Sequence, residues 1–326
     1  MRPFRRLHAA VLAMLLIATM CAAGCSGREQ NHDANAFPVE HPNALGGPDT
    51  SDVSTTSLDV AYATQSQAQK MDVFLPASGS GPFPIIIAIH GGGFRYGDKA
   101  DSQLVPMIEG LERGYAVASI NYRLSDEARW PAAINDVKAA IRFLRANSAT
   151  YGIDPERFAV WGDSAGGDLA ALAGTSGGVE ALADPAQGNA TQSDRVQAVI
   201  DWFGPIDYEQ LEAQYAASPR GDLNGPDSVQ SQLFGRPLSA IPAEVRAANA
   251  ATYISADDPP FLIEHGGADG VVPVEQSTDF AAKLTERLGA DRVTLRVLPD
   301  AGHMDAVFVT PEHLDFVFDW LDARLK

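Results

Sequence analysis

The chain has 326 residues, of which 45% are hydrophobic, so it is long enough to bury one large core and too apolar to be disordered. Asp and Glu together number 42 and Lys and Arg 24, which gives a formal net charge of -18 at pH 7. This acidic balance argues against nucleic acid as a partner, because binding a phosphate backbone depends on Lys and Arg.

The first segment, residues 1–24, has the layout of an export signal. Arg residues precede an apolar run over about residues 9–23, and no acidic residue occurs before Glu29. The run is shorter than the roughly 20 residues that a membrane-spanning helix needs. The sequence Ala-Ala-Gly-Cys at residues 22–25 resembles the lipobox of bacterial lipoproteins, in which the Cys is lipidated. We therefore expect a lipoprotein held at the cell envelope by a lipid on Cys25, with plain secretion or a periplasmic location as the alternative.

The body of the chain contains no cysteine, because Cys21 and Cys25 are the only two. It therefore has no disulfide, thiol nucleophile or thiolate metal site, and we expect no metal or organic cofactor. Residues 25–56 are polar and lack apolar periodicity, which predicts a flexible tether, with a loop of the following domain as the alternative. A catalytic domain is expected over residues 57–326.

Short β-branched runs alternate with helical segments through this domain, which predicts an α/β fold with a mostly parallel central sheet and helices on both faces. Strands are expected at residues 70–75, 85–89, 115–120, 157–161, 196–201, 260–264 and 293–298, and helices from Pro131 and over residues 311–325. The alternation lapses over about residues 206–257. We interpret this stretch as a small insertion, which either caps a ligand crevice or is an inert excursion.

The candidate nucleophile is Ser164, in the sequence Gly-Asp-Ser-Ala-Gly-Gly at residues 162–167. The motif follows one predicted strand and precedes a helical stretch, and strand, G-x-S-x-G and helix form the context that makes it informative. The same letters occur in trypsin-like proteases. Those proteases need an upstream His and Asp, an all-β pattern and usually disulfides, and this sequence does not provide that combination.

A second motif, His-Gly-Gly-Gly at residues 90–93, directly follows the apolar strand predicted at 85–89. Glycines let a loop turn consecutive amides toward one point, and backbone N–H groups stabilise the negative charge that develops during acyl transfer. The motif therefore predicts an oxyanion-binding loop rather than a plain turn.

Elimination among the histidines leaves His303 as the candidate base, with His265 as its rival. His303 follows the last predicted strand, where a loop can reach Ser164, whereas His313 lies in the terminal helix and is expected to be structural. The acid is expected to be Asp269, which follows the penultimate strand and gives the order Ser, Asp, His. Asp300 is the alternative acid.

These motifs resemble the α/β-hydrolase superfamily, specifically its HGGG-bearing bacterial esterases and the bifunctional acetylxylan and feruloyl esterase group. Residues 121–124, 130–133 and 202–205 support the resemblance, which spans about residues 58–326. It implies that the amides of Gly92, Gly93 and Ala165 form the oxyanion hole.

The resemblance also implies a serine carboxylic-ester hydrolase acting on short-chain or plant cell-wall esters, so its partner would be a small ester or an esterified polysaccharide. An amidase with the same triad, such as an arylformamidase or a peptidase, is an alternative, and so is a non-catalytic surface binding lipoprotein. Five aromatic residues near strand ends are candidates either for the acyl pocket or for the core: Phe94, Tyr96, Trp130, Trp202 and Phe203.

Overall fold

The computed structural model describes residues 55–215, 225 and 227–326. The predicted export signal, Cys25 and nearly all of the predicted tether lie outside these residues. The strands are β1 (Thr55–Ala61), β2 (Lys70–Leu75), β3 (Phe83–Ile89), β4 (Ala116–Ile120), β5 (Ile153–Asp163), β6 (Ala198–Trp202), β7 (Phe261–Gly266) and β8 (Val293–Leu298). The domain boundary predicted at residue 57 therefore falls inside β1, and the last two residues assigned to the tether belong to that strand.

All eight strands form one sheet in the order β1-β2-β4-β3-β5-β6-β7-β8. β1 and β2 pair antiparallel, as do β2 and β4, and every later pair is parallel. The predicted mostly parallel sheet is thus confirmed. Because parallel strands end at the same edge, the segments that follow β3, β5, β7 and β8 are brought to one side of the sheet.

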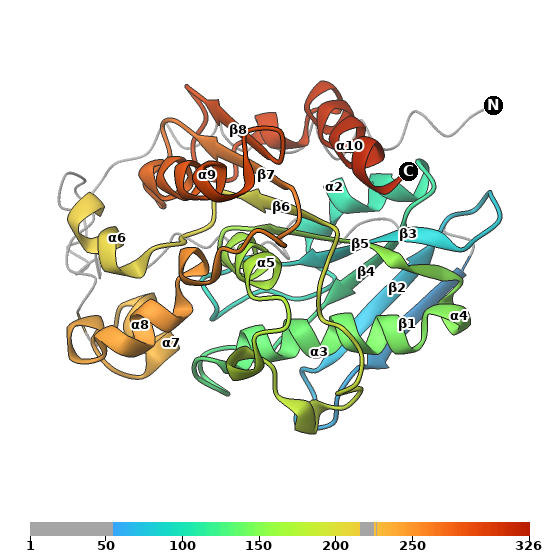
Figure 1. Cartoon of the computed structure of the whole chain (residues 1–326), viewed down its shortest axis with the longest axis horizontal. Helices are drawn as coiled ribbons and strands as arrows, with labels where there is room; N and C mark the ends of the chain where they lie inside the picture. The colour runs from blue at the N-terminus through green and yellow to red at the C-terminus, as the bar shows by residue number, and fades with distance from the viewer. Residues whose placement is uncertain (1–54, 216–224, 226) are drawn as a thin grey trace, which may run out of the picture.

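Helices cover both faces of this sheet (Figure 1). They are α2 (Val105–Ile108), α3 (Ala132–Ala146), α4 (Ser148–Tyr151), α5 (Ala165–Thr175), α6 (Tyr208–Tyr215), α7 (Val229–Phe234), α8 (Pro242–Ala248), α9 (Glu275–Leu288) and α10 (Pro311–Leu325). Short 3-10 helices occupy Ser102–Leu104, Glu109–Leu111, Glu180–Leu182, Pro185–Gln187, Leu238–Ala240, Ala250–Tyr253 and Ala306–Val309. Among the described helices none is long and apolar enough to cross a membrane.

Alternate residues of β3 enter two different cores. Ile85, Ile87 and Ile89 pack with residues of α3, α5 and α9 on one face, whereas Ile86 and Ala88 pack with residues of α2 and α10 on the other. This strand is buried on both faces, as its continuous apolar run predicts for a central parallel strand.

The insertion predicted over about residues 206–257 contains α6, α7 and α8, between β6 and β7. In Figure 1 these three helices lie together at the left of the molecule, on the side away from β1 and β2.

Candidate active site

Ser164 is the single residue between β5 and α5. Its backbone has φ 52°, a left-handed conformation that non-glycine residues rarely adopt, and its amide donates to the Trp202 carbonyl at 2.8 Å. A Cβ at Gly166 would lie 2.0 Å from the Ile89 carbonyl oxygen, and a Cβ at Gly162 would lie 2.1 Å from the oxygen of Gly166. The glycines are therefore required for the close approach of backbone that the sharp turn at Ser164 creates.

His303 bridges Ser164 and Asp269. Its Nε2 lies 3.1 Å from Ser164 Oγ, and its Nδ1 lies 2.7 Å from Asp269 Oδ2. A carboxylate only accepts hydrogen bonds, so the proton belongs on Nδ1 and the Nε2 lone pair faces the Ser164 hydroxyl. This arrangement lets His303 remove the hydroxyl proton when Ser164 attacks an electrophile.

The two rival residues from the sequence lie elsewhere. Asp300 is exposed just beyond β8. His265 is fully buried and lies beside Asp269 instead of Ser164, with 3.3 Å between its Nε2 and Asp269 Oδ2. The structure thus brings together Ser164, His303 and Asp269, the set preferred from the sequence.

The Asp269 carboxylate accepts hydrogen bonds on both oxygens. Oδ1 accepts from the amides of Val271 at 2.7 Å and Val272 at 3.0 Å, while Oδ2 faces His303 and His265. Burial alone would raise the pKa of Asp269, but its contacts with His265 and His303 outweigh burial and hold that pKa well below its usual range. The carboxylate is consequently ionised at neutral pH and stabilises positive charge on His303.

A small pocket opens beside Ser164. Gly93 and Ala165 line it with Ser164, and neither of their amides has a hydrogen-bond acceptor among the described residues. Both are thus available to an oxyanion on the substrate. Gly92, also expected to donate, is absent from the described pocket lining; with φ 102° it forms the turn, and its carbonyl accepts from the amides of Arg95 and Tyr96.

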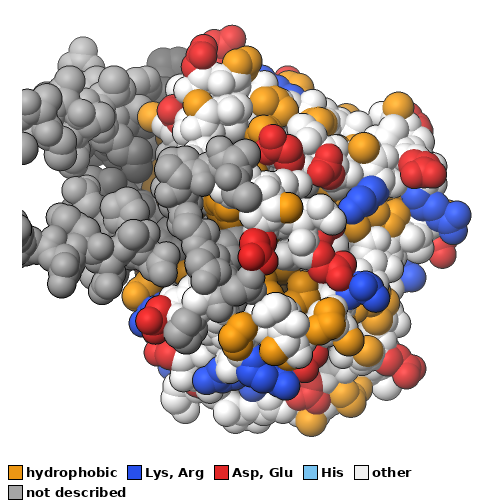
Figure 2. All heavy atoms as spheres, turned by 90° about the vertical axis from the view of Figure 1, so that its left-hand side faces the viewer, with side chains coloured by type: hydrophobic (Ala, Val, Ile, Leu, Met, Phe, Trp, Pro, Cys, Tyr) orange, Lys and Arg blue, Asp and Glu red, His pale blue; other side chains and the backbone are white. Residues whose placement is uncertain are grey.

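The insertion supplies part of the lining of this pocket. Tyr208 and Tyr215 of α6 and Val229 and Gln230 of α7 line it together with Ser164. Sequence reasoning did not identify these four residues, because nothing in the amino-acid pattern of the insertion indicates which of its side chains turn toward the sheet. Figure 2 shows the left-hand side of the molecule, where hydrophobic side chains lie exposed among acidic and basic ones.

Only one of the five candidate aromatic residues is found among the described residues that line the pocket, and it is Phe94. Phe203 packs edge-on against the His303 ring, with 4.7 Å between ring centroids. Trp202 donates its indole N–H to Glu264 in the core, and Tyr96 is 40% exposed. Trp130 lies 6.0 Å from the Phe234 ring. Most of these aromatics therefore have packing roles.

The loop at residues 90–93, which the sequence predicts to bind the oxyanion, packs against Tyr122 through His90. We call it the oxyanion loop. The Tyr122 ring stacks on His90 at 4.5 Å between centroids, and its hydroxyl donates to the His90 carbonyl at 2.9 Å. Burial lowers the pKa of His90, so its neutral ring can donate from Nδ1 to the Gly91 carbonyl at 2.8 Å. These contacts hold His90, the first residue of the loop, in place.

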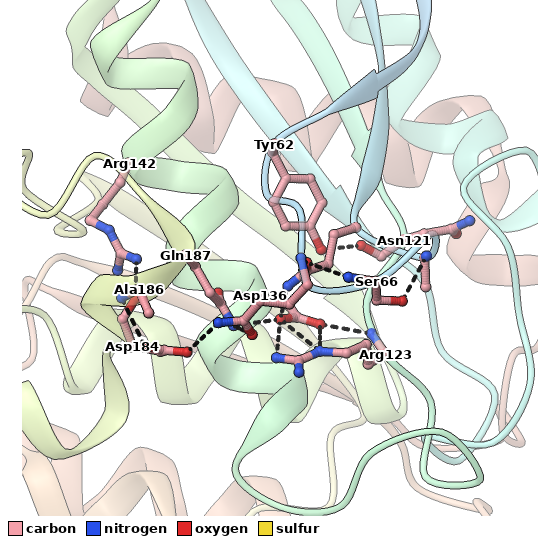
Figure 3. A network of polar contacts seen from close by, with 12 residues as sticks. Tyr62, Ser66, Asn121, Arg123, Asp136, Arg142, Asp184, Ala186 and Gln187 are labelled. Carbon is pink, nitrogen blue, oxygen red and sulfur yellow. Dashed lines mark hydrogen bonds and ion pairs between the residues drawn. The ribbon is translucent and has the colours of Figure 1, made fainter.

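Arg123, next to Tyr122, is held by Asp136 of α3 (Figure 3). The guanidinium makes a bidentate contact with this fully buried carboxylate, which also accepts from the side-chain amides of Gln69 and Gln187. Bidentate Arg–carboxylate pairs fix geometry as well as charge. The pair holds the segment after β4 against α3. Because Tyr122 precedes Arg123 in this segment, it is held in contact with His90 of the oxyanion loop.

Asp163, immediately before the nucleophile, is a buried carboxyl without a hydrogen-bond partner among the described residues. One of its oxygens lies so close to Gly91 that a Cβ there would approach it to 2.8 Å. Burial raises the pKa of Asp163 from its usual 3.8 to about 7. The folded chain therefore favours the protonated form of this carboxyl.

We expect Asp163→Asn to remove a loss of stability that the wild type suffers as pH rises. The unfolded chain ionises this carboxyl near pH 4 and the folded chain only near pH 7. The stability that the Asp163 carboxyl contributes is therefore fully present below about pH 4 and is lost as the pH rises to about 7. Asn mimics the protonated carboxyl. Melting temperatures measured between about pH 5 and pH 8 should favour the variant increasingly with pH, whereas Asp300→Asn, at an exposed position, should track the wild type. A constant difference between Asp163→Asn and the wild type would contradict this account.

Within the described part of the chain, no group of three or more His, Cys, Asp or Glu residues is arranged to hold a metal ion.

The chain is similar to known esterases in sequence and in structure. The chain is 33% identical over 223 residues to esterase LipC of Mycobacterium tuberculosis, which covers 68% of this chain and 53% of LipC. It is 32% identical to esterase LipQ of the same organism, covering 84% of this chain and 63% of LipQ. The chain thus spans about half to two thirds of the length of these curated relatives.

Among solved structures, a truncated carbohydrate esterase from gut microbiota superposes with a TM-score of 0.77 at 31% identity, covering 85% of this chain and 98% of that one. A bifunctional GH43-CE protein of Bacteroides eggerthii gives a TM-score of 0.74 at 33% identity, covering 83% of this chain and 35% of that one. The BD-FAE family matches residues 71–284, which include Ser164 and Asp269. Together with the mostly parallel sheet and its flanking helices, these matches show that the chain belongs to the BD-FAE family.

Proposed function

We propose that the protein is a serine carboxylic-ester hydrolase that works through an acyl-enzyme. The observation that carries this proposal is the position of His303, with one ring nitrogen on Asp269 and the other on Ser164 Oγ. The esterase relatives and the carbohydrate esterase structure support an ester as the substrate.

In the proposed reaction His303 takes the proton of Ser164 as Oγ attacks the ester carbonyl carbon. The carbonyl oxygen becomes negative and is stabilised by the amides of Gly93 and Ala165, with Gly92 as the further candidate donor. Asp269 stays ionised and holds the imidazolium. His303 then gives the proton to the departing alcohol, and a water molecule repeats the steps on the acylated Ser164.

The pocket beside Ser164 favours a short acyl group. Among the described residues its cavity measures about 30 Å³, and the lining outside the insertion is mostly apolar or aromatic, including Phe94, Pro205 and Val272. By the same measure one water needs about 10–15 Å³, so the space suits an acetyl group better than a long chain. The substrates we propose are short-chain esters, including the acetyl esters of polysaccharides, and the carbohydrate esterase structures support the latter.

A panel of p-nitrophenyl acetate, butyrate and octanoate, with methyl ferulate and acetylated xylan, tests the substrate assignment. We expect kcat/KM to be highest for acetate and to fall about tenfold or more by octanoate, since each additional methylene must find room in the pocket. The matched acetanilide separates an esterase from an amidase and should turn over far more slowly. Faster hydrolysis of octanoate than acetate would contradict the short-acyl assignment, and faster hydrolysis of the anilide would favour the amidase.

A further inference from the structure

Two imidazoles converge on the Asp269 carboxylate, and the proposed reaction uses only one of them. His303 Nδ1 lies 2.7 Å from Oδ2, and His265 Nε2 lies 3.3 Å from the same oxygen. The side chains of Asp269 and His265 are both fully buried. His265 therefore belongs to the immediate surroundings of the acid although it is remote from Ser164.

The neighbours of His265 determine which of its nitrogens carries a proton. Nε2 also lies 3.0 Å from the Val272 carbonyl oxygen, which can only accept, so Nε2 bears the hydrogen. Nδ1 lies 2.6 Å from Ser277 Oγ in the first turn of α9, and Ser277 is fully buried as well. The ring is thus held at both nitrogens: its Nε2–H donates to the Val272 carbonyl, and Asp269 Oδ2 lies 3.3 Å from the same nitrogen.

This arrangement restrains the carboxylate. Val271 and Val272 hold Oδ1 through their amides, the Val272 carbonyl accepts from His265, and His265 Nε2 lies 3.3 Å from Oδ2. The bond to His303 changes as charge moves onto and off that ring during each acyl transfer, whereas the contact with His265 does not take part in proton transfer. A buried carboxylate that lost this polar neighbour would be held less firmly opposite His303 Nδ1.

We propose that His265 is a positioning residue for the hydrolysis proposed above, on which this inference rests. Its ring, held by Ser277 and by the Val272 carbonyl, packs against Asp269 and keeps the carboxylate in the position from which it fixes the His303 tautomer. His265 does not contact Ser164 and is not among the residues that line the pocket, so its effect on the reaction passes through Asp269 and through Val272, whose carbonyl it bonds.

The test compares His265→Leu and His265→Gln with a matched control. Leu removes the donor, whereas the Gln side-chain amide places an N–H close to the position of imidazole Nε2. His313→Leu is the control, because His313 is also buried and bonded to a buried carboxylate, Glu264 at 3.0 Å, without contacting the three residues of the site. Readouts are kcat and KM for p-nitrophenyl acetate, melting temperature, and the far-downfield proton signal of His303 Nδ1–H.

We expect kcat of His265→Leu to fall about 10- to 100-fold, the effect of losing one buried polar contact with a charged group, with KM within about twofold. His265→Gln should recover most of the rate, and the His303 Nδ1–H signal should be lost in the Leu variant and return in the Gln variant. His313→Leu should lower the melting temperature and leave kcat and the signal unchanged. Ser277→Ala, a milder change, should lower kcat in the same direction if His265→Leu does not fold.

A folded His265→Leu with wild-type kcat and an unaltered His303 signal would overturn the inference, and so would a Gln variant as slow as the Leu variant. If the Leu variant is unfolded, unchanged kcat in Ser277→Ala overturns it. These outcomes differ from failure of the proposed function, in which the wild type itself would not hydrolyse the ester. The Nδ1–H signal tests the positioning role even then, because it does not depend on turnover.

Discussion

Ser164→Ala should abolish hydrolysis of p-nitrophenyl acetate, with a fall in kcat on the order of 10⁶-fold, as removal of the nucleophile causes in other serine hydrolases. The change deletes the only atom that His303 Nε2 faces in the triad, so no acyl-enzyme can form. What remains is the modest acceleration that substrate binding and the amides of Gly93 and Ala165 can provide to attack by water.

The fold should survive this change. The turn at residue 164 is imposed by the close backbone contacts of Gly162 and Gly166, and the residue's amide, not its side chain, bonds Trp202. Circular dichroism and the melting temperature should therefore match the wild type. Turnover by Ser164→Ala at the wild-type rate would refute Ser164 as the nucleophile.

Asp269→Asn should lower kcat by about 10⁴-fold, the loss seen when the acid of a serine protease triad is made an amide. An amide has one accepting oxygen, and the amides of Val271 and Val272 compete for it. The Asn NH₂ group then faces His303 and donates to Nδ1, which forces the ring proton onto Nε2. In that tautomer His303 cannot take the proton of Ser164.

Asp300→Asn provides the control for this prediction, because Asp300 is also close to His303 in sequence but is exposed. It should keep wild-type kcat and KM. Kinetics of the purified variants distinguish the two carboxylates directly: a harmless Asp269→Asn together with a damaging Asp300→Asn would mean that the acid had been assigned to the wrong residue.

The regular parts of the fold could be predicted from local pattern. Strands at residues 70–75 and 293–298 and the helix at 311–325 have the bounds expected from the sequence. The first strand was missed for a physical reason. Asp59 has φ 54° and the β1–β2 register shifts between Ser57 and Val60, so a bulge breaks the two-residue period that would reveal the strand.

The partners of Ser164 could be predicted from the sequence because the fold fixes where the segments after its parallel strands lie. Segments after successive parallel strands meet at one edge of the sheet, so the order of Ser164, Asp269 and His303 along the chain was informative. The orientation of His265 was not, because a histidine at the end of a strand could face either Ser164 or Asp269. The choice depends on Ser277, twelve residues away in α9.

Supporting networks were likewise beyond local pattern. The Asp136 carboxylate accepts hydrogen bonds from Gln69 and Gln187, which are 67 and 51 residues away in the chain. No short sequence motif predicts these bonds. Helical periodicity places Lys138 outside the apolar stripe of α3, yet it is fully buried, because Asp194 and the Ser176 carbonyl accept from its ammonium. Such pairs form only once distant segments have been folded together.

Intact-mass spectrometry after treatment with a fluorophosphonate tests the central claim most directly, since this probe forms a bond only to a serine whose hydroxyl is activated. The account predicts a single adduct per chain, mapped to Ser164 by peptide analysis, and no adduct on Ser164→Ala. Wild-type protein that stays unlabelled under conditions where a known serine esterase reacts, or that carries its adduct on another residue, would contradict it.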